Sequence, residues 1–216
     1  MHMRTLIIQY SPEHTASTLL VNALYGLIPS LSNKPIVYND FRLNANAPVQ
    51  VIKTHNSNLD AFISRYSNLY KVFFICSERE ERNLLVNSKY KSYDNVVVFP
   101  YSELNETDTN TLPNIINNIA NKIRDLLNIE LDVESGINRI TLMNSLYESI
   151  KEKPFTFYDR FYHIHGSHRN RKDTKPNTPA VTHGLSSSVN TPVTPVVQKP
   201  SSDKRDVLFY RHYFHT

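Results

Sequence analysis

The chain has 216 residues and a mass of 25.0 kDa, with 40% hydrophobic residues and one cysteine, Cys76. This composition supplies a core and excludes global disorder, and the length predicts one domain with room for a second small one. One cysteine excludes an intramolecular disulfide framework and a multi-cysteine zinc site. No apolar run reaches the ~20 residues that span a bilayer, and none has the flanks of a signal peptide, so we expect a cytoplasmic protein without a membrane span.

The net charge of +4 is concentrated near the C-terminal end. Residues 171–216 hold seven Lys/Arg and three Asp, which leaves 17 residues of each sign in residues 1–170. A neutral folded part argues against a broad basic face, so we expect no nucleic-acid partner. A site for a small anion must then be built from a few local groups.

Short apolar strands alternate with amphipathic helices along the first 150 residues. This alternation predicts right-handed βαβ units around a mostly parallel sheet, an α/β fold with three αβα layers. Strands are predicted at 5–10, 49–54, 71–77 and 96–100, and helices at 16–27, 58–66, 79–88, 115–127 and 133–150.

The composition changes after residue 170. We expect residues 1–170 to form the α/β domain and residues 171–205, rich in Ser, Thr and Pro, to form a flexible linker. Residues 206–216 are rich in aromatics, which predicts a C-terminal docking segment. Such a segment can add a strand to a sheet edge, either its own or that of a second copy or a protein partner.

The first candidate site segment follows the first predicted strand. Thr15, Ser17 and Thr18 open a helix there, and a helix N-terminus offers free N–H groups and a positive dipole end to an anion. The segment is not a Walker A loop, because residues 1–25 contain no glycine and the chain has no Gly-Lys-Ser/Thr triplet. The plainer alternative is that these hydroxyls cap the helix.

The second and third segments follow two later strands. Lys53 and His55 share one side of a strand end, where the cation can neutralise a leaving group and the imidazole can accept a proton. Arg79 directly follows a strand, and Arg79 with Asn87 or Ser88, about two helical turns later, can hold a phosphate. The plainer alternatives are a solvated strand end and a solvated, charged helix start.

Together these segments resemble the P-loop sulfotransferases that use 3′-phosphoadenosine 5′-phosphosulfate (PAPS). The segment His14-Thr-Ala-Ser-Thr-Leu-Leu20 is similar to the family's phosphosulfate loop, and Lys53-Thr-His55 matches the Lys-Thr-His of its cytosolic members. Arg79 and Asn87 fall on the family's Arg and Ser, eight residues apart, and residues 97–104 resemble its later strand and turn. The likeness extends from about Thr5 to Leu131 and implies a P-loop NTPase-like fold.

The resemblance implies roles for these residues. PAPS is the implied co-substrate, without a metal, and a small-molecule or macromolecular hydroxyl is the implied acceptor. His55 would deprotonate the acceptor and Lys53 would stabilise the leaving phosphate. The phosphosulfate would lie on His14, Thr15, Ala16, Ser17 and Thr18, and the 3′-phosphate on Arg79, Asn87 and Ser88.

Departures from the family pattern keep other functions open. His14 replaces the basic residue of the first loop, Ala16 its glycine, and Asn87 the serine of the phosphate pair. The family's late Arg-Lys-Gly segment is absent, and residues 162–172, including Arg169, stand in a comparable place. The main alternative is an inactive sulfotransferase-fold protein that acts as a structural or interaction module through its C-terminal tail. Another P-loop nucleotide enzyme, such as a small kinase, is disfavoured by the missing glycines.

The late histidines and aromatics allow two further interpretations. His163, His165 and His168 have a spacing that can hold zinc, but no fourth ligand is evident and the neighbourhood is basic, so we expect no metal site. The aromatic residues at 155–162 are expected to pack in or beside the core rather than to form a wall for adenine or an acceptor.

Overall fold

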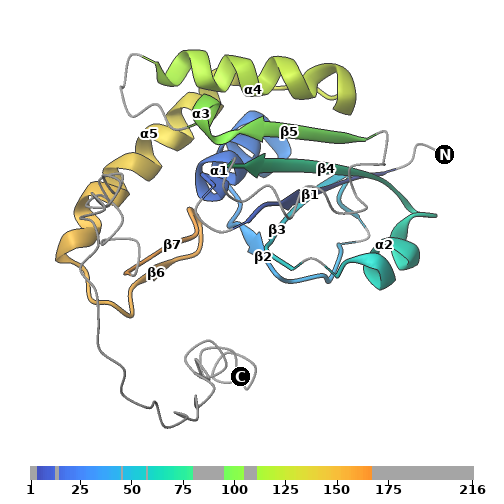
Figure 1. Ribbon diagram of the computed structural model, residues 1–216, viewed down its shortest axis with the longest axis horizontal. Helices are drawn as coiled ribbons and strands as arrows, with labels where there is room; N and C mark the ends of the chain where they lie inside the picture. Colours follow the sequence, from blue (N-terminus) through green and yellow to red (C-terminus); the bar gives the residue numbers. More distant parts are fainter. Residues whose placement is uncertain are drawn as a thin grey trace, which may run out of the picture. The chain divides into compact units, whose positions relative to one another are not determined.

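Five parallel strands form the central sheet in the order β2-β3-β1-β4-β5 (Figure 1). The α/β class with a mostly parallel sheet is therefore confirmed. The sequence pattern does not predict β2, because a strand of two residues carries no readable periodicity. The strands are β1 (Arg4–Tyr10), β2 (Val37–Tyr38), β3 (Val49–Thr54), β4 (Tyr70–Glu78) and β5 (Val96–Pro100).

The computed structural model describes residues 4–12, 15–44, 46–56, 58–79, 95–104 and 111–166. The predicted helix at 79–88, apart from Arg79, lies outside these ranges, and so do the predicted linker and docking segment. The site residues that lie outside them are His14, Asn87, Ser88 and Arg169, together with His168 of the histidine motif.

The first strand of the chain lies at the centre of the sheet. Leu6, Ile7 and Ile8 of β1 are all fully buried. A parallel strand covered on both faces is apolar along its whole length, which explains the unbroken hydrophobic run. Gln9 and Tyr10, at the end of β1, lie opposite Lys53 and Thr54 at the end of β3.

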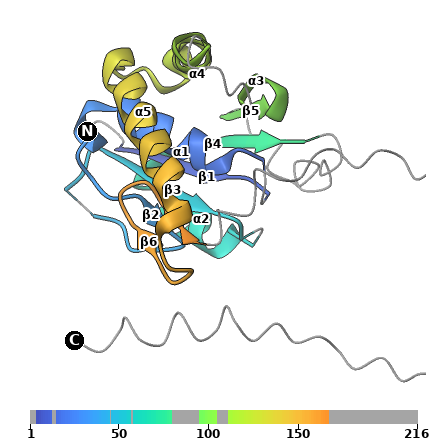
Figure 2. The same cartoon turned by 90° about the vertical axis from the view of Figure 1, so that its left-hand side faces the viewer.

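Helices cover both faces of this sheet (Figures 1 and 2). On one face, α1 (Ser17–Leu27), α4 (Leu112–Leu127) and α5 (Val133–Ser149) close the larger core. On the other face, α2 (Asp60–Tyr66) packs on a smaller core through Ile63. In the part of the chain that the structure describes, no helix is long and apolar enough to cross a membrane. Short elements complete the fold: α3 (Tyr101–Leu104), the 3₁₀ helices η1 (Pro29–Leu31) and η4 (Ile150–Glu152), and the hairpin strands β6 (Tyr158–Asp159) and β7 (Ile164–His165).

Two glycines let α1 and α5 approach closely. A Cβ added to Gly26 of α1 would lie 2.7 Å from the Cα of Gly136 and 3.0 Å from the carbonyl oxygen of Ser135. Real Cβ atoms do not come this close to backbone atoms, so the helix crossing requires glycine at residue 26. The contact fixes α1, whose first turn carries the first candidate site segment.

A buried arginine of α5 binds both to earlier segments of the chain and to the segment that follows α5. Arg139 is 6% exposed and donates hydrogen bonds to the Asn22 amide oxygen and to the carbonyls of Ser32, Lys34 and Phe161. Its guanidinium also lies 5.2 Å from the Tyr25 ring centroid. Burial lowers the pKa of Arg139 below its usual value. The apolar periodicity of α5 predicts its core face but gives no signal for a buried cation within it.

Candidate functional site

The three predicted segments meet at one edge of the sheet. Because β1, β3 and β4 are parallel neighbours, their carboxyl ends lie side by side. The chain passes from β1 to β3 on one side and then to β4 on the other, so the strand order reverses at β1. Ligands of open α/β sheets bind in the crevice outside such a reversal.

The turn after β1 brings an uncapped helix start to this edge. Ala16 precedes α1 with φ 60° and ψ 24°, the left-handed region that favours glycine. No side chain of the described residues caps α1, so the hydroxyls of Thr15, Ser17 and Thr18 do not have the capping role that was the alternative. The first N–H groups of a helix have no partner within the helix, and an anion can accept from them.

Lys53 of β3 points toward this helix start. Its side chain is 2% exposed, and Nζ donates a hydrogen bond of 3.0 Å to the hydroxyl of Thr18. Nζ also lies 5.9 Å from the ring centroid of Tyr38 on β2. The structure therefore brings the second segment into contact with the first. Among the described residues, a buried ammonium group beside an uncapped helix start contributes positive charge to this corner of the sheet.

His55 faces the same turn from the end of β3. Its Nδ1 is hydrogen-bonded to the backbone carbonyl of Ser11. A carbonyl oxygen can only accept, so Nδ1 carries the proton and, in the neutral ring, Nε2 carries the lone pair. The ring is half-buried, and its centroid lies 5.8 Å from that of Tyr38 in an edge-on contact. This tautomer suits an imidazole that accepts a proton through Nε2.

Thr15 is turned inward rather than toward the edge. Its hydroxyl donates to the carbonyl of Pro12 at 2.7 Å and lies 3.0 Å from the Ser77 hydroxyl. Ser77 in turn bonds to the Ser11 hydroxyl through both its N–H and its Oγ, and Gln9 donates to the same hydroxyl at 2.6 Å. All of these side chains are fully buried. The cluster therefore fixes the turn after β1 against the end of β4, and any contact of Thr15 with a ligand would have to come from its backbone.

Arg79 lies at the end of β4 and is half-buried. Its guanidinium carbon lies 3.5 Å from the ring centroid of Tyr101 on α3, a close cation–π contact. Its Nε is buried and has no hydrogen-bond partner among the described residues. Asn87 and Ser88, the predicted partners in phosphate binding, lie outside those residues. Of the residues predicted to bind the 3′-phosphate, the structure therefore describes only Arg79.

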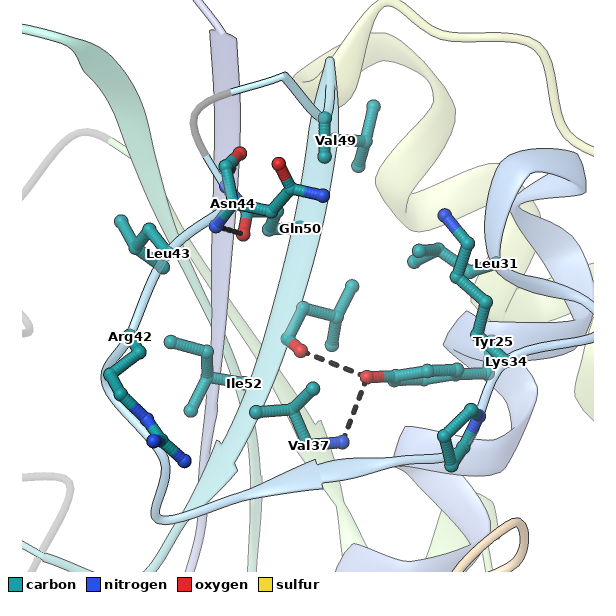
Figure 3. A pocket seen from close by; sticks show the side chains of 13 residues that line it. Tyr25, Leu31, Lys34, Val37, Arg42, Leu43, Asn44, Val49, Gln50 and Ile52 are labelled. Carbon is teal, nitrogen blue, oxygen red and sulfur yellow. Dashed lines mark hydrogen bonds between the residues drawn. The ribbon is translucent and has the colours of Figure 1, made fainter.

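A separate pocket lies beside strand β3, and residues of β2 and β3 are among those that line it (Figure 3). The cavity has a volume of about 140 Å³, and its walls include Leu31, Lys34 and Val49. Tyr25 also lines it, and its hydroxyl donates to the carbonyl of Val51 and accepts from the N–H of Val37, both at 3.0 Å. None of the predicted site residues lines this pocket.

Several residues at the edge have no signal in the sequence pattern. Tyr38 belongs to the short strand that periodicity does not predict, and Ser11 and Ser77 look like ordinary polar residues at strand ends.

The described residues contain no group of three or more His, Cys, Asp or Glu suited to a metal. No protein-family model matches the chain, and a search of curated proteins finds no match.

Proposed function

We propose that the chain is a sulfotransferase-like protein with a P-loop NTPase-like fold that transfers a sulfuryl group from PAPS to a hydroxyl acceptor. The observation that carries this proposal is the hydrogen bond from Lys53 to Thr18. It joins a buried cation to an uncapped helix start that follows a left-handed residue. A phosphosulfate needs such a combination of positive charge and free N–H donors.

The chemistry assigned to this edge is an in-line transfer. Nε2 of His55 takes the proton of the acceptor hydroxyl while the acceptor oxygen forms a bond to sulfur. The bond between sulfur and the bridging oxygen of PAPS breaks, and 3′,5′-ADP leaves with the electron pair. Lys53 and Thr18 stabilise the charge on the departing oxygen, and Arg79 binds the 3′-phosphate. The tautomer imposed by the Ser11 carbonyl supports the role of His55.

Calorimetric titration with 3′,5′-ADP and with ATP tests the proposal. Selective binding of 3′,5′-ADP is the expected result, and Lys53→Met and Arg79→Ala are each expected to weaken it by about tenfold or more, since each removes a charge-assisted hydrogen bond. Lys71→Met is the matched control, because Lys71 is exposed on β4 away from the edge. Binding of ATP alone would indicate another nucleotide enzyme. Absence of binding to both ligands would favour an interaction module and refute the proposal.

His55→Ala separates binding from chemistry. The variant should keep the wild-type affinity for 3′,5′-ADP, because the role proposed for the imidazole is with the acceptor hydroxyl and not with the nucleotide. Transfer of ³⁵S from labelled PAPS to a panel of hydroxyl compounds should be lost. A variant that still transfers label at the wild-type rate would exclude His55 as the base.

A further inference from the structure

The β6–β7 hairpin supplies a second imidazole beside this edge. His163 is 6% exposed, and its backbone has φ 52°, a left-handed conformation in which His is tolerated better than most residues. Its ring centroid lies 4.4 Å from that of Tyr38, with 39° between the planes. Its Nδ1 is 3.1 Å from the Tyr158 hydroxyl. The imidazole thus contacts two tyrosines, one through its ring and one through Nδ1.

Three hydrogen bonds anchor the chain that leads into His163. The carbonyls of residues 160–162 accept, in order, from the N–H of Ile36, the guanidinium of Arg139 and the side-chain amide of Asn22. The donors come from the residue before β2, from α5 and from α1. Since the anchors come from three elements, the position of His163 is set by the whole fold and not by the hairpin alone.

Tyr38 links His163 to the candidate site. The same phenol ring contacts His163 and also lies near His55 and Lys53, with separations of 5.8 Å to the His55 ring centroid and 5.9 Å to Lys53 Nζ. Tyr38 is half-buried on the two-residue strand β2 at the margin of the sheet, so little strand pairing restrains it. The His163 ring is one of the contacts that can fix the rotamer of such a side chain.

We propose that His163 is a positioning residue that holds the Tyr38 ring against Lys53 and His55, so that the hairpin completes the transfer site. The inference rests on the proposed function for the meaning of the site, but the contact itself can be tested without any ligand. His163→Asn removes the ring and keeps a residue that tolerates the left-handed backbone, whereas His163→Phe keeps a ring at the same place.

Nuclear Overhauser effects between the ring protons of Tyr38 and His55, measured in protein labelled at Tyr and His, give the ligand-free test. We expect them in the wild type and in His163→Phe, and their loss in His163→Asn. The affinity for 3′,5′-ADP should fall about fivefold in His163→Asn and recover in His163→Phe, the scale of one aromatic contact. Thermal unfolding of each variant checks that the fold is kept.

A double-mutant cycle with Tyr38→Leu decides whether the effect passes through Tyr38. In the Tyr38→Leu background, His163→Asn should not weaken 3′,5′-ADP binding further. If His163→Asn does not fold, the affinities of Tyr38→Leu and Tyr38→Phe for 3′,5′-ADP are compared instead. The fivefold loss of affinity is then expected in Tyr38→Leu and not in Tyr38→Phe. Persistence of the Overhauser effects in His163→Asn, or wild-type affinity in Tyr38→Leu, overturns the inference. If the wild-type protein does not bind 3′,5′-ADP, the proposed function is refuted. The Overhauser measurement still decides whether His163 positions Tyr38.

Discussion

Replacing Ala16 with glycine should stabilise the protein. The backbone of Ala16 has φ 60°, and an L-residue with a Cβ costs about 1–2 kcal/mol in this region. Glycine removes that strain but raises the entropy lost on folding by about 0.5–1 kcal/mol relative to alanine. The mid-range values favour Ala16→Gly by about 0.75 kcal/mol, which corresponds to a rise in Tm of about 1.5–3 °C for a chain of this size.

Urea denaturation and thermal unfolding measure this change, and Ala61→Gly is the matched control. Ala61 is the exposed second residue of helix α2, so the same substitution should there lower the free energy of unfolding, by at most about 1 kcal/mol. The two variants are therefore expected to differ in sign. Equal destabilisation by both would mean that Ala16 is not in the left-handed region, and the account of the turn after β1 would fail.

Three other substitutions test the packing behind the site. Gly26→Ala places a methyl group 2.7 Å from the Cα of Gly136, and overpacking should cost about 1–3 kcal/mol in urea denaturation; wild-type stability would contradict the close helix crossing. Arg139→Met leaves buried carbonyls without donors and should cost about 3 kcal/mol or more, whereas a loss below 1 kcal/mol would show that the hydrogen bonds contribute little. Burial raises the pKa of Tyr25 from 10.0 to about 12, so the folded state resists ionisation and its stability should fall as pH rises from 10 to 12. Tyr25→Phe should flatten that fall while costing about 1–3 kcal/mol at pH 8, and an unchanged slope would exclude Tyr25 as its source.

The sequence predicts the elements that have a long periodic pattern. Strands at 49–54 and 96–100 agree with β3 and β5 to the residue, and the helix at 16–27 differs from α1 by one residue. These segments are buried on one or both faces, so their hydrophobic pattern reports their structure directly. Strand β2 and the hairpin β6–β7 have strands of two residues, which form because of tertiary contacts and leave no local pattern.

Some features of the candidate site can likewise be predicted from the sequence, whereas others depend on contacts between distant residues. Lys53 and His55 can be predicted because residues i and i+2 of a strand share a side, and the structure directs both toward the turn after β1. The inward turn of Thr15 cannot be predicted, because its partner Ser77 lies 62 residues away and the hydroxyl network forms only when β1 and β4 pair. The roles of Tyr38 and Arg139 depend on distant contacts in the same way.

The central place of β1 has a consequence for how the molecule is made. Strand β1 precedes the other strands of the sheet along the chain and pairs with β3 on one side and β4 on the other, so the continuous sheet forms only after both later strands have been synthesised. Such late pairing predicts slow folding and a nascent chain that depends on protection from aggregation. Trimming the first ten residues would divide the sheet in two, whereas losing an edge strand would only narrow it.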